Sequence, residues 1–129
     1  MIARRAALAL IGGLAAIPFA RAADGARPFD KASFDAALAS KKPFLVHVSA
    51  PWCPICRAQK PILEKLRAEP RFKDFEMFEV DFDNDKPATR LVNARLQSTL
   101  IVYKDGREVA RTVGDREEGW IEELMEKAL

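Results

Sequence analysis

Apolar residues recur at spacings that predict a helix and then a strand in the first part of the chain. Behind Ser33, apolar positions follow at helical intervals, which predicts a short amphipathic helix over 33–40 with Ser33 as its N-cap. The next run, 44–49, is apolar and rich in β-forming residues, as is typical of a parallel strand covered on both faces. We expect this run to form the central strand of a sheet.

The following stretch combines a helical pattern with a second strand pattern. Between Cys53 and Ala68, apolar residues occupy one helical face, whereas polar residues, Gln59 among them, occupy the other. Pro61 lies inside this pattern and is expected to kink the helix, because proline has no N–H for the helical hydrogen bond. Apolar and polar residues then alternate over 75–82, which predicts a second parallel strand.

A third helix and a β-hairpin come next. Asp85 is suited to cap this helix, and we expect Leu91 and Val92 to face inward from it. Strand-like runs on either side of Asp105-Gly106 predict a hairpin over 99–113, because Asp-Gly favours the tight turn that joins two antiparallel strands.

The C-terminal segment predicts one more amphipathic helix. Asp115 and Glu118 have the spacing of a capping box, in which each side chain satisfies a backbone N–H at the start of a helix. One apolar stripe follows, and we expect it to face the core: Trp120, Ile121, Leu124, Met125 and Ala128. The predicted order is therefore helix, strand, helix, strand, helix, strand, strand, helix, without an internal repeat.

The length and the N-terminal segment predict one exported domain. The chain has 129 residues, enough for a single domain whose core needs no disulfide to be stable. Residues 1–22 combine a basic start, an apolar run and the small-x-small sequence Ala20-Arg21-Ala22, which predicts a cleaved export signal. The apolar run falls short of the ~20 residues that a spanning helix requires, so an uncleaved anchor is the less favoured alternative. We expect residues 23–129 to form the mature domain, with no stable membrane insertion.

The charge balance argues against nucleic acid as a partner. The whole chain carries 21 basic and 19 acidic residues, and loss of Arg4, Arg5 and Arg21 with the signal leaves 18 basic ones. Both signs are interspersed without a basic stripe, so the electrostatic footprint of a nucleic-acid-binding protein is missing. An exported chain with a cysteine pair fits an oxidising compartment, and we expect the bacterial periplasm.

The candidate chemistry lies in Cys53 and Cys56, the two cysteines of the chain, at the junction between the predicted central strand and the helix after it. Unpaired N–H groups and the positive dipole end at a helix N-terminus favour thiolate over thiol. We therefore expect Cys53 to be the nucleophile. Cys56 follows one helical turn later, where it can attack a mixed disulfide on Cys53, so we expect it to be the resolving thiol.

Two other uses of this cysteine pair stay open. The cysteines could be buried structural residues, or they could supply half of a zinc site. Because the chain has one histidine, His47, and no third cysteine, a complete zinc site within one chain would also need carboxylates. The alternative to a redox enzyme is a non-catalytic binding module, or a dimer that holds a metal or an iron–sulfur cluster on four cysteines from two chains.

The predicted elements together resemble the thioredoxin family over 29–129. The resemblance is carried by the strand and active-site loop at 46–56, by Pro61 in the following helix, and by the hairpin segment 99–106. It implies an α/β fold with a central mixed sheet of about four strands and helices on both faces. It also implies disulfide exchange with protein substrates and a thiol electron donor, and we expect a monomer without a cofactor or a metal.

Three positions depart from the family pattern. Ser98, after Gln97, stands where the family has a cis-proline beside the cysteines. We expect a trans Gln97–Ser98 bond, because a non-proline cis peptide costs ~2.5–4 kcal/mol. His47 stands where many members have a buried aspartate, and Glu79 stands where they have a lysine.

By the same resemblance, the rim around the cysteines is expected to contact substrate: Trp52, Pro54, Ile55, Gln97 and Ser98. Trp52 is expected to be partly exposed there. Strong oxidants of the family often carry a histidine between the cysteines, whereas Ile55 offers neither a charge nor a donor. We therefore favour a reductant of exported proteins over an oxidant.

His47 and Glu79 are candidate catalytic residues. Strand parity places His47 on the face with Leu45 and Ser49. The resemblance implies that this face points toward the resolving cysteine and that Glu79 lies on the neighbouring strand. If the two side chains pair, His47 could titrate near neutrality and carry the proton of Cys56. The alternative is a neutral core histidine that is bonded to backbone or water.

Overall fold

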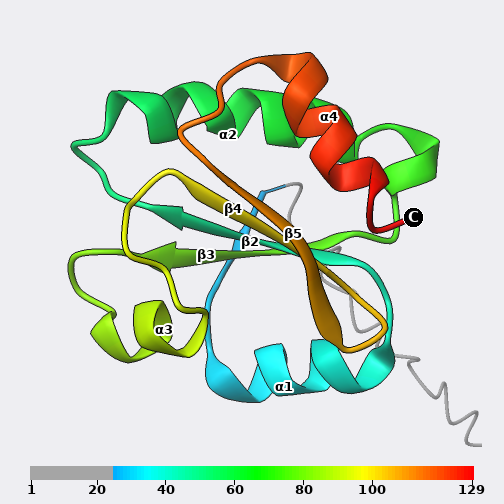
Figure 1. Cartoon of the computed structure of the whole chain (residues 1–129), viewed down its shortest axis with the longest axis horizontal. Coiled ribbons are helices and arrows are strands. Elements are labelled where there is room, and N and C mark those ends of the chain that lie inside the picture. Colours follow the sequence, from blue (N-terminus) through cyan, green and yellow to red (C-terminus); the bar gives the residue numbers. More distant parts are fainter. Residues whose placement is uncertain (1–24) are drawn as a thin grey trace, which may run out of the picture.

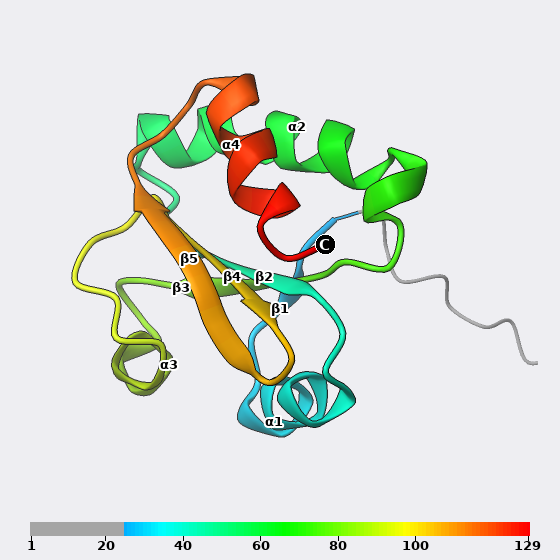
Figure 2. The same cartoon turned by 45° about the vertical axis from the view of Figure 1, so that its right-hand side comes forward.

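The computed structural model describes residues 25–129 as one sheet with helices on both faces (Figures 1 and 2). The strands are β1 Arg27–Pro28, β2 Phe44–Ser49, β3 Glu76–Asp81, β4 Thr99–Lys104 and β5 Arg107–Val113. The helices are α1 Lys31–Ser40, α2 Pro54–Arg67, the short 3₁₀ helix Pro70–Phe72, α3 Lys86–Leu91 and α4 Glu118–Glu126. None of the helices between residues 25 and 129 has the length and apolarity to span a bilayer. The predicted export signal, 1–22, lies outside the described residues.

The sheet is mixed, with β2 at its centre, as predicted. The strand order is β1-β3-β2-β4-β5, in which β1, β3 and β2 are parallel and β4 and β5 are antiparallel additions. The sheet has five strands instead of the expected four or so. The additional strand, β1, has two residues, Arg27 and Pro28, and is too short to produce an alternating pattern.

Alternation along β2 divides the interior into two cores. Its even positions, represented by Val46, pack with α1 and α3, while Leu45 packs with α2 and α4. Figure 1 shows these two helix pairs on opposite faces of the sheet. His47 has the parity of Leu45, so its side chain faces α2, as strand parity predicted.

The starts of two helices differ from prediction. α1 begins at Lys31, because the carboxylate of Asp30 accepts the N–H of Ser33 at 2.8 Å, so Asp30 rather than Ser33 is the N-cap. α4 begins at Glu118 after Glu117, which makes no side-chain cap. The expected capping box is absent there because Asp115 binds the hydroxyl of Thr112 instead.

Two apolar side chains that were expected to be inward are exposed. Leu91 is 45% exposed because α3 ends at this residue and the chain turns there, so that Val92 alone enters the core. Trp120 is 60% exposed, because the positions of α4 that pack on the core begin one residue later, at Ile121. The hairpin prediction is confirmed: Asp105 and Gly106 both have positive φ, of 55° and 78°, as its tight turn requires.

Candidate active site

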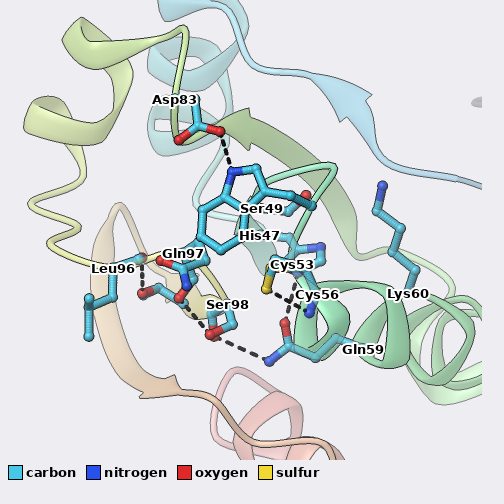
Figure 3. Close-up of a disulfide and its surroundings, with 12 residues drawn as sticks. His47, Ser49, Cys53, Cys56, Gln59, Lys60, Asp83, Leu96, Gln97 and Ser98 are labelled. Carbon is cyan, nitrogen blue, oxygen red and sulfur yellow. Dashed lines mark hydrogen bonds between the residues drawn. A yellow bond between two sulfur atoms is a disulfide. The ribbon is translucent and has the colours of Figure 1, made fainter.

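The two cysteines form a disulfide at the start of α2, directly beyond the end of β2 (Figure 3). Cys53 is the N-cap residue of α2, and its Sγ accepts the backbone N–H of Cys56 at 3.1 Å. Both residues are almost completely buried, at 2% and 0% exposure. The sulfur of Cys53 therefore sits among the unpaired N–H groups of a helix start, which favours a thiolate after reduction.

The rim around this disulfide is exposed on the side of the active-site loop. Trp52 is 55% exposed, as expected, and its indole N–H donates to the carboxylate of Asp83 at 2.6 Å. Pro54 is exposed and Ile55 is half-buried. The aromatic and apolar side chains of this loop are therefore accessible to a partner protein, whereas the sulfurs are shielded from bulk water.

The segment before β4 approaches the disulfide from the other side. No peptide bond between residues 25 and 129 is cis, so the trans prediction for Gln97–Ser98 is confirmed. Ser98 has a φ of +59°, in the left-handed region that residues with a side chain seldom adopt. Ser98 is buried, and its carbonyl accepts the N–H of Gly114 at 3.0 Å. Hydrogen bonds, rather than a proline ring, hold this segment in place.

His47 is buried against α2, but its partner is not the one that we expected. The residue is 1% exposed, and its Nε2 lies 2.9 Å from Oε1 of Gln59. The predicted direct pair with Glu79 is wrong, although the two residues are register partners on β2 and β3. The carboxylate of Glu79 instead pairs with Lys60 of α2 at 2.9 Å and accepts the hydroxyl of Ser49 at 2.9 Å.

These surroundings determine the charges of His47 and Glu79 at neutral pH. Burial lowers the pKa of His47 below its ordinary value, and this effect outweighs the hydrogen bond to Oε1 of Gln59 and the nearby charge of Glu79, which raise it. Burial raises the pKa of Glu79, but Lys60 and Ser49 lower it more, and it ends below its ordinary value. His47 is therefore neutral and Glu79 ionised at neutral pH.

Gln59 is the site residue that the sequence prediction missed. We expected it on the polar face of α2, yet it is completely buried. Its Nε2 donates to the backbone carbonyls of Ser98 at 3.2 Å and Asp115 at 2.7 Å, while Oε1 faces His47 (Figure 3). The spacing 56, 59, 63, 66 of the buried positions on α2 was the available signal, because it marks a single helical face.

Glu79 also lines a pocket beside the active-site loop. The pocket has a volume of about 300 Å³ and includes Ser49, Pro51 and Lys60. Residues 25–129 contain no cluster of three or more histidine, cysteine or acidic side chains that could hold a metal ion. The groups that this site brings together are thus a disulfide, a neutral imidazole, a carboxamide and a lysine–carboxylate pair.

Comparison with known proteins gives consistent matches. A family model described as thioredoxin matches residues 26–127. Thioredoxin of Chlamydia pneumoniae is 39% identical over 95 residues, which cover 74% of this chain and 90% of that protein. Thioredoxin-1 of Saccharomyces cerevisiae is 36% identical over 81 residues, which cover 63% of this chain and 77% of that protein.

Solved structures agree with these matches. The crystal structure of Trxlp from Edwardsiella tarda has a TM-score of 0.75 and 38% identity, and the match covers 78% of this chain and 97% of that one. A mutant thioredoxin from Halobacterium salinarum has a TM-score of 0.70, covering 81% of this chain and 91% of that one. Its 23% identity makes this second match evidence for the fold alone.

Proposed function

Since this chain belongs to the thioredoxin family and is a thiol–disulfide oxidoreductase, we propose that it reduces disulfides of exported proteins in the periplasm. The observation that carries the proposal is the Cys53–Cys56 disulfide at the N-terminus of α2, next to the exposed Trp52. A nucleophile at a helix start, a second thiol one turn away and an exposed rim are what reduction of a protein disulfide requires.

In the first step of the proposed reaction, the Cys53 thiolate attacks one sulfur of the substrate disulfide. A bond forms between Cys53 and that sulfur, and the other substrate sulfur leaves as a thiolate. The N–H of Cys56, which donates to Sγ of Cys53, helps to stabilise the attacking thiolate. The product of this step is a mixed disulfide.

In the second step, Cys56 loses its proton and attacks Sγ of Cys53. The second substrate sulfur leaves as a thiolate, and the Cys53–Cys56 disulfide forms, so that two electrons have passed to the substrate. An external dithiol must then reduce this disulfide to restart the cycle. A thiol electron donor in the same compartment is therefore part of the proposal.

We also propose that His47 receives the proton of Cys56. His47 binds Gln59, which lies on α2 one turn beyond Cys56, and its lowered pKa keeps it neutral and able to accept a proton at neutral pH. Glu79 favours the protonated imidazole by its charge, without a direct hydrogen bond to it.

Three further parts of the proposal rest on the sequence. Residues 1–22 have the composition of an export signal, which supports the periplasm as the compartment. Ile55, between the cysteines, lacks a charge that would stabilise the thiolate further, which supports a reductant rather than a strong oxidant. We propose that the mature protein acts as a monomer.

The reduction potential of the Cys53–Cys56 couple tests the direction of electron flow. Equilibration of the mature protein with glutathione should give a value near that of reducing members of the family, about −270 mV. A value near about −120 mV, typical of strong oxidants, would overturn the reductant proposal. The wild-type protein should accelerate the reduction of insulin by dithiothreitol, whereas Cys53→Ser should not. Equal rates with the two proteins would overturn the oxidoreductase mechanism.

Export is tested separately. The full chain, expressed in a bacterium and fractionated, should yield a periplasmic product that lacks residues 1–22, as measured by mass spectrometry. A product of full length that stays in the cytoplasm would overturn the predicted compartment without affecting the proposed chemistry.

A further inference from the structure

We propose that Gln59 is a positioning residue for disulfide exchange, which holds the Gln97–Ser98 segment against the active-site helix and fixes the tautomer of His47. The inference rests on the disulfide exchange proposed above. It adds to that reaction a residue that forms no covalent bond in it. The carboxamide of Gln59 connects three elements that meet at the disulfide: strand β2, the segment before β4 and the segment before α4.

The first step of the argument is that every polar group of Gln59 is used. The side chain is completely buried, and a buried carboxamide without partners would cost folding free energy. Its two N–H donors have two carbonyl acceptors, on Ser98 and Asp115, and its oxygen faces His47. A leucine or isoleucine at this buried helical position would fill space, but it could not join these three segments.

The second step is that the partners fix the orientation of the carboxamide. Backbone carbonyls only accept hydrogen bonds, so the NH₂ group of Gln59 must face Ser98 and Asp115. Its oxygen must then face His47, and an oxygen there requires a donor on Nε2. Neutral His47 therefore carries its proton on Nε2 and its lone pair on Nδ1, which defines the nitrogen that can accept a further proton.

The third step concerns the backbone of Ser98. Its φ of +59° is unfavourable for a residue with a side chain, so surrounding contacts must maintain this conformation. The Ser98 carbonyl accepts one hydrogen bond from the backbone of Gly114 and one from Gln59. Gln59 thus reaches from α2, one turn beyond Cys56, to the residue that follows Gln97 on the rim (Figure 3).

A substrate protein and a small disulfide should respond differently to the loss of this contact. A protein substrate must fit against the Gln97–Ser98 segment while its disulfide meets Cys53, whereas a small aromatic disulfide needs access to Cys53 alone. Gln59→Met keeps the length of the side chain and removes its hydrogen bonds. We expect this variant to reduce the protein substrate more slowly than the wild type does, and to reduce the small disulfide at the wild-type rate.

The experiment compares two rate constants in each of three mature proteins: wild type, Gln59→Met and, as the matched control, Glu64→Met on the exposed face of α2. Stopped-flow measurements give the second-order rate constants with insulin and with a small aromatic disulfide such as dithionitrobenzoate. In Gln59→Met the ratio of the two should fall about tenfold, which corresponds to about 1.4 kcal/mol of transition-state stabilisation. In Glu64→Met the ratio should equal that of the wild type.

The His47 tautomer is measured in the wild-type protein, so it does not depend on a variant that folds. Because the chain has one histidine, ¹⁵N-NMR of a sample purified without a histidine tag reports this ring alone. We expect a protonated Nε2 and an unprotonated Nδ1 above neutral pH. In Gln59→Glu, which keeps the acceptor for His47 but loses both donors, this tautomer should persist while the rate ratio falls.

Three outcomes would overturn the inference. The first is a proton on Nδ1 of His47 in the wild-type protein, and the second is a rate ratio that is unchanged in both Gln59 variants. The third is an equal loss of the two rate constants, with insulin and with the small disulfide, which would indicate general damage to the fold. A wild-type protein that is slow with both disulfides would instead count against the proposed function, and the tautomer would still decide the geometry assigned to Gln59.

Discussion

Replacing His47 by glutamine should remove a pH dependence of stability that the wild-type protein shows below neutrality. Burial lowers the pKa of His47 in the folded protein, so the native state keeps the ring neutral. The unfolded chain takes up a proton there below about pH 6.5. Because the unfolded state then binds more protons than the native state, the free energy of unfolding must fall as the pH falls. A glutamine N–H can still donate to Oε1 of Gln59, so this variant removes the titration and keeps the hydrogen bond.

The magnitude follows from the difference of one proton. For an unfolded pKa of about 6.5 and a ring that stays neutral when folded, lowering the pH from about 7.5 to about 5.5 costs up to about 1.4 kcal/mol. The loss continues with falling pH until the native pKa of His47 is reached, because both states are protonated below it. Burial lowers that native pKa most, the hydrogen bond with Gln59 and the charge of Glu79 raise it, and Lys60 lowers it, so these four together set the end of the window.

Urea unfolding of the oxidised wild-type and His47→Gln proteins at the two pH values measures this difference. Carboxylates and lysines contribute to the pH dependence of both proteins, so their effects largely cancel in the comparison. Since His47 is the only histidine of the chain, no other imidazole contributes. Stability that changes equally with pH in both proteins would refute the conclusion that His47 is held neutral by burial.

Three other changes have defined outcomes. In Cys53→Ser, disulfide reduction should be abolished, whereas Cys56→Ser should retain partner proteins as mixed disulfides, seen on non-reducing gels; rapid release of partners from Cys56→Ser would contradict the assigned roles. Glu79→Gln should lower the pKa of His47 further, because it removes a charge that raises it, and an NMR titration that gave a higher pKa would contradict this electrostatic account. Leu63→Ala should reduce the free energy of unfolding in urea by about 2–5 kcal/mol, because Leu63 is completely buried on the core-facing side of α2, and a loss under about 1 kcal/mol would show that the cavity collapses.

The main elements of the fold could be predicted because their patterns are strong. The run at 44–49 is apolar because both of its faces are buried, and this pattern predicts a central strand. Asp105-Gly106 predicts the hairpin turn. β1 could not be predicted from two residues. The cap of α1 was misplaced by one turn because Asp30 and Ser33 are both suitable N-cap residues, and the choice depends on how the chain enters the helix.

The candidate site could be predicted where spacing alone determines it. Cys53 and Cys56 lie three residues apart on one helix, and strand parity gave the face of His47 correctly. The partner of His47 could not be predicted, because it depends on how α2 is rotated about its axis over the sheet. That rotation brings Gln59 to His47 and leaves Glu79 to Lys60 and Ser49.

The same rotation determines where the sulfurs point, and this gives Gln59 its importance in the site. The side chains of Cys53, Cys56 and Gln59 are separated by three residues each, so a turn of α2 about its axis moves all three together. Pro61 follows two residues after Gln59 and cannot donate to the carbonyl of Arg57, which weakens the helix where the active-site turn joins the rest. Hydrogen bonds from Gln59 to Ser98 and Asp115 anchor this first part of α2 to segments outside the helix. The carboxamide of Gln59 therefore helps to set the position of the disulfide relative to the rim through tertiary contacts, and a local sequence pattern does not contain that information.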